Sequence, residues 1–413
     1  MITHWAIFTD NNSHKKDFID SILKGVNPHF EQLNTKKGAL FSPISLYKFI
    51  DEEERHEHKF LVNSNQPLKS LSSGEQKKAL LYYIIKSNPD YIILDNPFDN
   101  LDIDFQQELK VMFLKYSNQI CFVQLVSRKD DLLPFITNFG TLKQHVFTNQ
   151  IDSKNTEGNK DENSKIILSG PIPKALETIE IKDDILVKFK DVSVAYGNKK
   201  IVNHIDWTVK KREFWQLIGK NGSGKTTLLS MITGDNPKGY GQDLFLFGQK
   251  KGTGESVWDI KKKLGYFTPA MTDKFTGRHS VENMLISGLT DSIGLYIKPT
   301  EAQLKIIKEW LMLVGLWDKR NALFREISLG QKRLIMTVRA MVKHPPLLIL
   351  DEPTTGMDDI SARILVALTN KIAKETQTTI IFVSHRKEPG LEPKKIFELK
   401  TTQQGSYGSI QNL

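Results

Sequence analysis

The chain has 413 residues, 39% of them hydrophobic, which is enough for two core-bearing domains and excludes a chain that is disordered as a whole. Its net charge is +9, but lysines are scattered through both halves, so the excess does not by itself indicate a nucleic-acid or lipid partner. No apolar stretch approaches the roughly 20 residues of a membrane span, and residues 1–10 lack a secretory leader. Cys121 lies in an apolar run, which predicts a core strand. Because it is the one cysteine of the chain, an intrachain disulfide is excluded, which fits a cytoplasmic protein.

The first half opens on an apolar run, residues 5–8, which predicts a strand. A polar loop follows it and reads Thr9-Asp10-Asn11-Asn12-Ser13-His14-Lys15-Lys16. Further along, a loop containing serine and glycine precedes a helical pattern, and an apolar run ends in an acid. These segments read Leu71-Ser72-Ser73-Gly74-Glu75-Gln76 and Tyr91-Ile92-Ile93-Leu94-Asp95-Asn96-Pro97. A third apolar run ends in Ser127-Arg128.

Residues 151–180 are predicted to be a linker between two domains, 1–150 and 181–413. Segment 151–164 is polar and poor in apolar residues, so it cannot bury enough surface to order itself. Its charges nearly cancel, which argues against an arm that grips nucleic acid.

The second half contains a complete phosphate-binding loop between a strand-like run, residues 214–218, and a helical pattern that starts near residue 228. The loop reads Gly219-Lys220-Asn221-Gly222-Ser223-Gly224-Lys225-Thr226-Thr227. Its glycines allow successive backbone N–H groups to curl around phosphate oxygens. Lys225 is placed to reach the β- and γ-phosphates, and the Thr226 hydroxyl can ligate Mg²⁺. The loop therefore predicts ATP or GTP chemistry.

Three segments after this loop correspond to segments of the first half. They read Ile327-Ser328-Leu329-Gly330-Gln331, Leu347-Leu348-Ile349-Leu350-Asp351-Glu352-Pro353 and Ser384-His385. Leu71 to Asp95 and Ile327 to Asp351 both span 24 positions, so we infer an internal duplication. Between the phosphate loop and the Ile327-Ser328-Leu329-Gly330-Gln331 segment, an amphipathic helical pattern predicts buried core positions. These are Val281, Leu285, Ile286, Leu289, Leu304, Ile307, Leu311 and Val314.

Together these motifs resemble the phosphate loop, signature loop, Walker B strand and switch residue of the ATP-binding cassette (ABC) ATPases. The tandem arrangement resembles the ModF-type proteins, which are associated with molybdate uptake, and residues 233–241 and 287–296 look characteristic of that subgroup. The resemblance spans nearly the whole chain. It implies an α/β fold with two P-loop NTPase domains, the first truncated and degenerate and the second complete with a helical subdomain.

The resemblance also implies a composite ATP site, because paired cassettes of this family place the phosphate loop of one against the signature loop of the other. The residues so assigned are Ser72, Ser73 and Gly74 from the first half, Thr226 and Asp351 for Mg²⁺, Glu352 as general base, His385 as γ-phosphate switch, Lys225 on the phosphates and Tyr196 on adenine. For His385, the alternative to the switch role is a purely structural one. For Tyr196, the alternative to stacking on adenine is that it is an ordinary aromatic residue at a strand edge. Ser72 with Glu75, and Ser328 with Gln331, also match the helix-capping spacing, and both interpretations can hold.

The second composite site would pair the polar loop of the first half, residues 9–16, with Ser328 and Gly330 of the second half. This site is predicted to be inactive. Thr9, Asn12 and His14 occupy glycine positions, and Lys16 replaces the Mg²⁺-binding hydroxyl. Asn96 replaces the catalytic glutamate, and an amide cannot act as a base. Arg128 stands where the second half has His385, and the surviving Lys15 leaves weak nucleotide binding open.

Three functions follow from these observations. The first is the ATP-binding subunit of a transport system with a separate membrane permease, located in the cytoplasm at the inner face of the membrane. Most members of the family carry a glutamine that contacts the permease, but this chain reads Thr268-Pro269-Ala270 at that place. The difference argues against coupling of the ATPase to a permease through this contact. The alternative is a soluble switch acting on a ribosome or nucleic acid, although the linker is short and charge-balanced. A phosphate-binding scaffold without turnover is disfavoured by the intact Asp351, Glu352 and His385.

Overall fold

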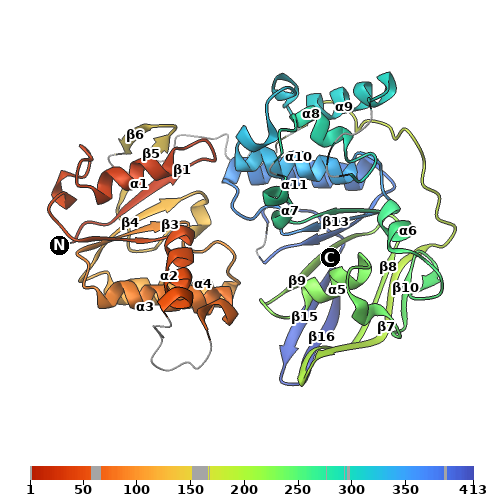
Figure 1. Ribbon diagram of the computed structural model, residues 1–413, viewed down its shortest axis with the longest axis horizontal. Coiled ribbons are helices and arrows are strands. Elements are labelled where there is room, and N and C mark those ends of the chain that lie inside the picture. The colour runs from red at the N-terminus through yellow and green to blue at the C-terminus, as the bar shows by residue number, and fades with distance from the viewer. Residues whose placement is uncertain are drawn as a thin grey trace. The chain divides into compact units, whose positions relative to one another are not determined.

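The computed structural model describes residues 2–56, 67–150, 166, 168–275, 277–292, 294, 298–385 and 388–413 (Figure 1). The chain forms two compact units, residues 1–164 with 356–359 and residues 165–355 with 360–413. Residues 151–165 and 167 of the predicted linker lie outside the described residues, as do positions 293 and 295–296 of the subgroup-like stretch. The domain boundaries that we placed from the sequence stay predictions.

The first unit is built on a six-stranded sheet with the order β2-β3-β4-β1-β5-β6, parallel except for the antiparallel pair β5 and β6. Its strands are β1 Trp5–Thr9, β2 Gly38–Phe41, β3 Tyr91–Asp95, β4 Cys121–Val126, β5 Asn138–Lys143 and β6 Val146–Gln150. Its helices are α1 Lys15–Leu23, α2 Pro43–His56, α3 Ser73–Lys86 and α4 Ile103–Tyr116, with short 3₁₀ turns η1 Glu31–Leu33, η2 Leu68–Ser70 and η3 Lys129–Asp131.

Helices cover both faces of this sheet, which explains why its central strands are mostly apolar. Along β3, Tyr91 and Ile93 join the core under α1, whereas Ile92 and Leu94 join the core under α2, α3 and α4 (Figure 1). Cys121 is buried on the α1 side, as the sequence predicted.

The second unit contains a ten-stranded sheet with the order β11-β10-β7-β8-β16-β15-β9-β14-β13-β12. Its strands are β7 Ile185–Tyr196, β8 Lys199–Lys210, β9 Phe214–Gly219, β10 Leu244–Leu246, β11 Gln249–Lys250, β12 Leu264–Phe267, β13 Leu347–Asp351, β14 Thr379–Val383, β15 Lys395–Thr402 and β16 Gly405–Asn412. Its helices are α5 Lys225–Ile232, α6 Val257–Lys262, α7 Pro269–Lys274, α8 Val281–Ile286, α9 Glu301–Leu313, α10 Leu329–Met341 and α11 Asp359–Glu375, with 3₁₀ turns η5 Pro237–Gly239, η6 Trp317–Lys319 and η7 Phe324–Glu326.

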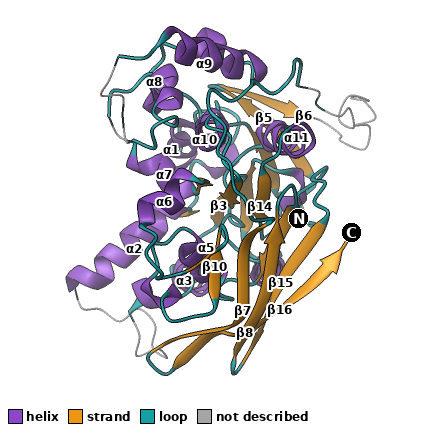
Figure 2. Cartoon of the chain, turned by 90° about the vertical axis from the view of Figure 1, so that its right-hand side faces the viewer, coloured by secondary structure: helices purple, strands orange, loops and turns teal. Residues whose placement is uncertain are grey.

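Six strands of the second sheet repeat the first sheet. The order β12-β13-β14-β9-β15-β16 matches β2-β3-β4-β1-β5-β6, and each neighbouring pair runs in the same relative direction. The second unit adds β7, β8, β10 and β11, of which β7 and β8 are long antiparallel strands (Figure 2). No described strand of the first unit corresponds to these four. The predicted α/β fold class is confirmed.

The predicted helical segment between the phosphate loop and the second signature loop forms α8 and α9. Helix α10 packs against β12 and α8, and α8 packs against α9. Most of the predicted core positions are buried, but Leu304 is 36% exposed, so that prediction was wrong. The buried face of α9 is formed by Ile306, Ile307, Trp310 and Leu311. Leu304 lies at the border of this face, so its side chain is partly exposed. None of the described helices is both long and apolar enough to cross a bilayer.

Candidate phosphate-binding and hydrolytic site

The complete phosphate loop connects β9 to α5, as the sequence predicted. Gly222 and Gly224 have φ values of 76° and 97°, a left-handed conformation that side-chain-bearing residues adopt reluctantly. A Cβ at Gly224 would also lie 2.5 Å from Cγ1 of Val202. Because the loop ends at the N-terminus of α5, the positive end of that helix dipole favours an anion there.

Two buried side chains of the loop are suited to a phosphate. Lys225 is 6% exposed, and its Nζ donates hydrogen bonds to the carbonyl oxygens of Gly219 and Lys220 at 2.7 and 3.0 Å. Ser223 is fully buried, and its hydroxyl has no hydrogen-bond partner in the described part of the chain. A buried hydroxyl without a partner is costly, and a phosphate oxygen would satisfy it.

The acidic residues lie at the end of β13. Glu352 follows Asp351 with φ of 51°, and its N–H donates to the carbonyl of Val383 at 3.0 Å. Positive φ in a non-glycine residue is strained and persists where the surroundings enforce it, often at functional sites. The Glu352 carboxylate contacts Nε2 of His385, which follows β14. The His385 side chain is 10% exposed, and its Nδ1 is buried without a partner among the described residues.

Burial and the neighbouring Glu352 charge raise the pKa of Asp351 to about 6, against the opposing effects of Lys225 and His385. The Tyr266 hydroxyl, from β12, lies 3.5 Å from Oδ2 of Asp351. Burial and this carboxylate raise the pKa of Tyr266. Sequence reasoning missed Tyr266. The sequence carries no signal for it, because the contact depends on the parallel register that sets Tyr266 opposite Ile349, two residues before Asp351 on the same face of the sheet.

We expect Asp351→Asn to stabilise the metal-free protein at alkaline pH. A carboxyl with a raised native-state pKa contributes stability below its unfolded pKa, near 3.8, and loses that contribution as pH rises through about 6. Removing the charge should therefore add up to about 3 kcal/mol to the free energy of unfolding at pH 8 and roughly half of that at pH 5. Denaturant unfolding with EDTA at both pH values measures it, and an equal effect at the two pH values would contradict it.

The remaining predicted site residues of the second unit lie at exposed or half-exposed positions. Tyr196 ends β7 with 48% of its surface exposed, and its hydroxyl accepts a hydrogen bond from Asn236 at 2.9 Å. Its ring is therefore held at one end, and Nζ of Lys238 lies over the ring, 5.8 Å from its centroid. Thr226 is exposed in the first turn of α5, while Asn221 and Thr227 are half-buried. Thr226 and Asp351 offer oxygen ligands only, which suits a hard cation such as Mg²⁺.

The signature loops begin helices in both units, and each is capped as predicted. Ser72 caps α3 through a reciprocal bond pair with Glu75, and Ser328 caps α10 in the same way with Gln331. Gly74 has a structural reason that the sequence did not reveal, because a Cβ there would lie 2.4 Å from the ring of Phe105 in α4. Ser73 donates its hydroxyl hydrogen to the carbonyl of Asn100 at 3.1 Å.

The eroded loop of the first unit uses its polar groups internally. The N–H groups of His14 and Lys15 donate to the carbonyls of Gln144 and Ser13 at 2.8 and 2.9 Å. The Lys15 ammonium donates to the Ser127 hydroxyl at 3.0 Å and lies 3.7 Å from the carboxylate of Asp95. The groups that would hold a phosphate in the second unit are thus occupied here.

The backbone after β3 nevertheless keeps the geometry seen after β13. Asn96 has φ of 44°, and its N–H donates to the carbonyl of Leu125 at 3.3 Å, as Glu352 does to Val383. The first unit therefore retains the strained turn with an amide in place of the carboxylate.

Comparison with known proteins identifies related chains. A family model described as ABC transporter matches residues 202–355. The chain is 37% identical over 339 residues to the ABC transporter ATP-binding protein ModF of Escherichia coli, covering 78% of this chain and 67% of that protein. It is 30% identical over 321 residues to an uncharacterized ABC transporter ATP-binding protein of Schizosaccharomyces pombe, covering 76% and 65%. The match thus spans about two thirds of the length of each relative.

Among solved structures, the archaeal ribosome recycling factor aABCE1, in complex with the ribosomal stalk protein aP1, matches with a TM-score of 0.63. The match covers 100% of this chain and 87% of that chain at 15% sequence identity. At this identity the likeness concerns the fold alone.

Proposed function

Because this chain belongs to the ATP-binding cassette (ABC) family of ATPases, whose members hydrolyse ATP, we propose that its second unit binds and hydrolyses ATP with Mg²⁺. One observation carries the proposal: a phosphate-loop lysine, two carboxylates and a histidine lie together, because Asp351 and Glu352 stand side by side at the end of β13, Glu352 contacts His385, and the buried Lys225 is near enough to oppose the rise in the pKa of Asp351. Phosphoryl transfer depends on such positioned charges. Release of phosphate from ATP by the purified chain tests it, and absence of turnover would reject it.

The phosphate loop holds the triphosphate in this proposal. Its backbone N–H groups and the N-terminus of α5 bind phosphate oxygens, and Lys225 exchanges its bonds with the loop carbonyls for bonds with the β- and γ-phosphates. The residues involved are Gly219, Asn221, Gly222, Ser223, Gly224, Lys225, Thr226 and Thr227. The exposed Tyr196 ring stacks on adenine.

Glu352 is the general base. Its carboxylate accepts a hydrogen bond from the attacking water and polarises it, and its contact with His385 fixes the carboxylate's direction. His385 also contacts the γ-phosphate. Thr226 and Asp351 would hold Mg²⁺, which would supply positive charge to neutralise the phosphate oxygens. Tyr266 orients the Asp351 carboxylate from its position 3.5 Å away.

We further propose that Ser72, Ser73 and Gly74 of the first unit complete this site. Capping of α3 by Ser72 and Glu75 gives a helix N-terminus with its positive dipole end, which suits a γ-phosphate. Ser72 is exposed at that end of the helix. The equivalent loop at Ser328 serves the eroded site and has no part in turnover.

A matched pair of variants tests this asymmetry. We expect Ser72→Ala to lower kcat by about 10²-fold, the usual effect of removing one donor to transition-state charge, and Ser328→Ala to leave kcat within twofold. Both variants lose the same kind of helix cap, which costs about 1 kcal/mol, so differences in stability do not explain a difference in rate. Equal losses of kcat in the two variants would exclude a composite site of this polarity.

For the partner, we propose a separate membrane permease, so that the chain is the ATP-binding subunit of a transport system at the cytoplasmic face of a membrane. Relatives named as transport proteins support it, among them the bacitracin transport ATP-binding protein BcrA of Bacillus licheniformis, 33% identical over 202 residues. Purification of the tagged chain from detergent-solubilised membranes of its source cell tests it. We expect an integral membrane protein to co-purify in a stoichiometric amount.

A soluble switch that acts on a ribosome or nucleic acid is the second candidate. The observation that favours it is Thr268-Pro269-Ala270, which replaces the permease-contacting glutamine and forms the start of α7. Sedimentation of the Glu352→Gln variant with ribosomes in the presence of ATP would support this candidate over a permease partner, provided that the association weakens steeply with salt.

A further inference from the structure

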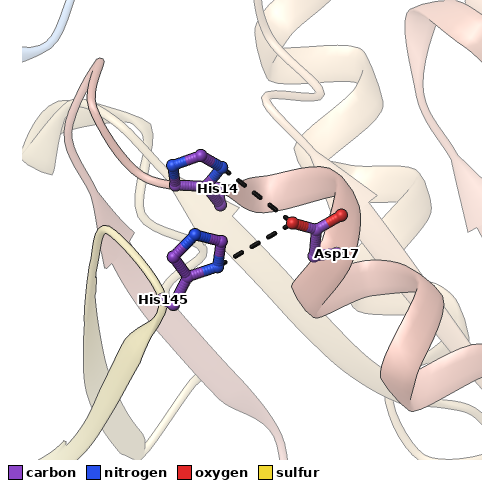
Figure 3. A group of neighbouring side chains, drawn as sticks. All are labelled: His14, Asp17 and His145. Atoms are coloured by element: carbon purple, nitrogen blue, oxygen red, sulfur yellow. Dashed lines mark ion pairs between the residues drawn. The ribbon is translucent and has the colours of Figure 1, made fainter.

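A group of side chains of the types that ligate metals lies on elements of the first unit that carry none of the proposed ATPase chemistry. His14 precedes α1, Asp17 lies in the first turn of that helix, and His145 lies in the two-residue turn between β5 and β6 (Figure 3). The His14 N–H donates to the carbonyl of Gln144, which ties this turn to the start of the helix. Two segments far apart in the sequence thus bring two imidazoles and a carboxylate close together.

The three side chains converge closely. Nδ1 of His14 and Nδ1 of His145 lie 3.9 and 3.8 Å from the same carboxylate oxygen of Asp17 (Figure 3). All candidate ligand atoms lie within 4.8 Å of one another, and the imidazole rings stack with centroids 3.8 Å apart. Bonds of about 2.1 Å around one ion separate its ligands by roughly 3.0–3.4 Å. More than half of each side chain is exposed, so small rotations suffice to close the set.

A hollow with a cavity volume of about 220 Å³ adjoins these side chains. His29 lines the same hollow, and Phe18 and Phe147 form an apolar wall beside it. The hollow therefore offers a further imidazole and room for water at coordination positions that the three side chains leave open.

These ligands belong to the first unit only. The equivalent positions of the second unit, by the shared order of strands and the loop alignment, are Gly224, Thr227 and Gln404. The glycine that the phosphate loop needs is thus replaced by His14 at the start of α1. In the second unit, the backbone at Gly224 is suited to an anion. In the first unit, the imidazole of His14 at the same position is suited to a cation.

We propose that His14, Asp17 and His145 bind a divalent transition-metal ion of the Zn²⁺ class. Two imidazole nitrogens with one carboxylate oxygen suit Zn²⁺, Co²⁺ or Ni²⁺, whereas Mg²⁺ and Ca²⁺ prefer all-oxygen sites. The ion joins α1 to the β5–β6 turn and strengthens a connection that otherwise consists of backbone and side-chain hydrogen bonds. The site is independent of ATP hydrolysis.

Metal titration of the untagged, nucleotide-free full chain tests the proposal. With excess Mg²⁺ present to occupy oxygen-only sites, Zn²⁺ should bind with one equivalent in calorimetry, and Co²⁺ should give visible absorption bands of a nitrogen- and oxygen-ligated site. His14→Ala and His145→Ala should each weaken binding at least about tenfold, because each removes one of three ligands. Zn²⁺ should also raise Tm of the wild type and not of the double variant.

His204→Ala is the matched control, because His204 forms an exposed pair with Asp191, 2.5 Å apart, in the second unit and belongs to no cluster of three ligands among the described residues. It should leave the affinity unchanged. Absence of Zn²⁺ binding, or affinity unchanged in folded His14→Ala and His145→Ala variants, overturns the proposal. Because the readout needs no ATP, failure of the ATPase proposal would leave this result untouched.

Discussion

Glu352→Gln should lower kcat for ATP hydrolysis by about 10²- to 10⁴-fold, the range expected when a general base is removed. Glutamine matches the size of glutamate and can keep a hydrogen bond to His385, but an amide does not accept a proton from water. The residue lies in a strained backbone conformation that fixes its direction, so the substitution changes the chemistry and leaves the geometry in place. Steady-state phosphate release measures the loss.

The affinity for ATP should stay within a few-fold in the same variant, because the phosphate loop is untouched. Binding of a fluorescent ATP analogue measures it. Asn96→Ala is the matched control, since Asn96 has the same backbone geometry in the first unit and no acid to lose. Undiminished turnover in Glu352→Gln, or an equal loss in Asn96→Ala, would place the base elsewhere.

Much of this fold was predictable from the sequence because the informative segments are local. An apolar run that ends in an acid predicts a buried parallel strand with its acid at the sheet edge, and both β3 and β13 conform. The glycine pattern at Gly222 and Gly224 predicts left-handed backbone, and both residues adopt it. The serine spacing predicted the capped helices α3 and α10.

Contacts between side chains that are far apart in the sequence were not predictable from local patterns. Tyr266 reaches Asp351 only because β12 and β13 are neighbours in a given register, which no local pattern encodes. His145 meets His14 because the β5–β6 turn lies against the start of α1. Gly74 was assigned to the ATP site from the sequence, and its close packing against Phe105 is a second reason for a glycine that only the structure shows. Each of these depends on which elements pack together.

The catalytic roles stay predictions. Lys225 and Lys15 hold corresponding positions in the two units, and the difference in their surroundings allows a direct test of which loop binds phosphate. Lys225→Ala should weaken ATP binding by at least about a hundredfold, since two charge-assisted bonds to phosphate are worth about 3 kcal/mol or more together. Lys225 is buried in a loop whose carbonyls hold it in place before nucleotide arrives. Equilibrium binding measures the loss, with Lys225→Arg to separate charge from shape.

Lys15→Ala should leave ATP affinity and the number of bound nucleotides unchanged, although Lys15 holds the corresponding position in the repeat. Its ammonium is already held by Ser127 and Asp95, and the amides beside it donate to protein carbonyls. A phosphate would have to displace those partners and still lack the glycine-lined loop, so it would lose more interactions than it gains. We therefore expect one nucleotide per chain by equilibrium dialysis. Two nucleotides, one of them lost in Lys15→Ala, would mean that the eroded loop still binds phosphate.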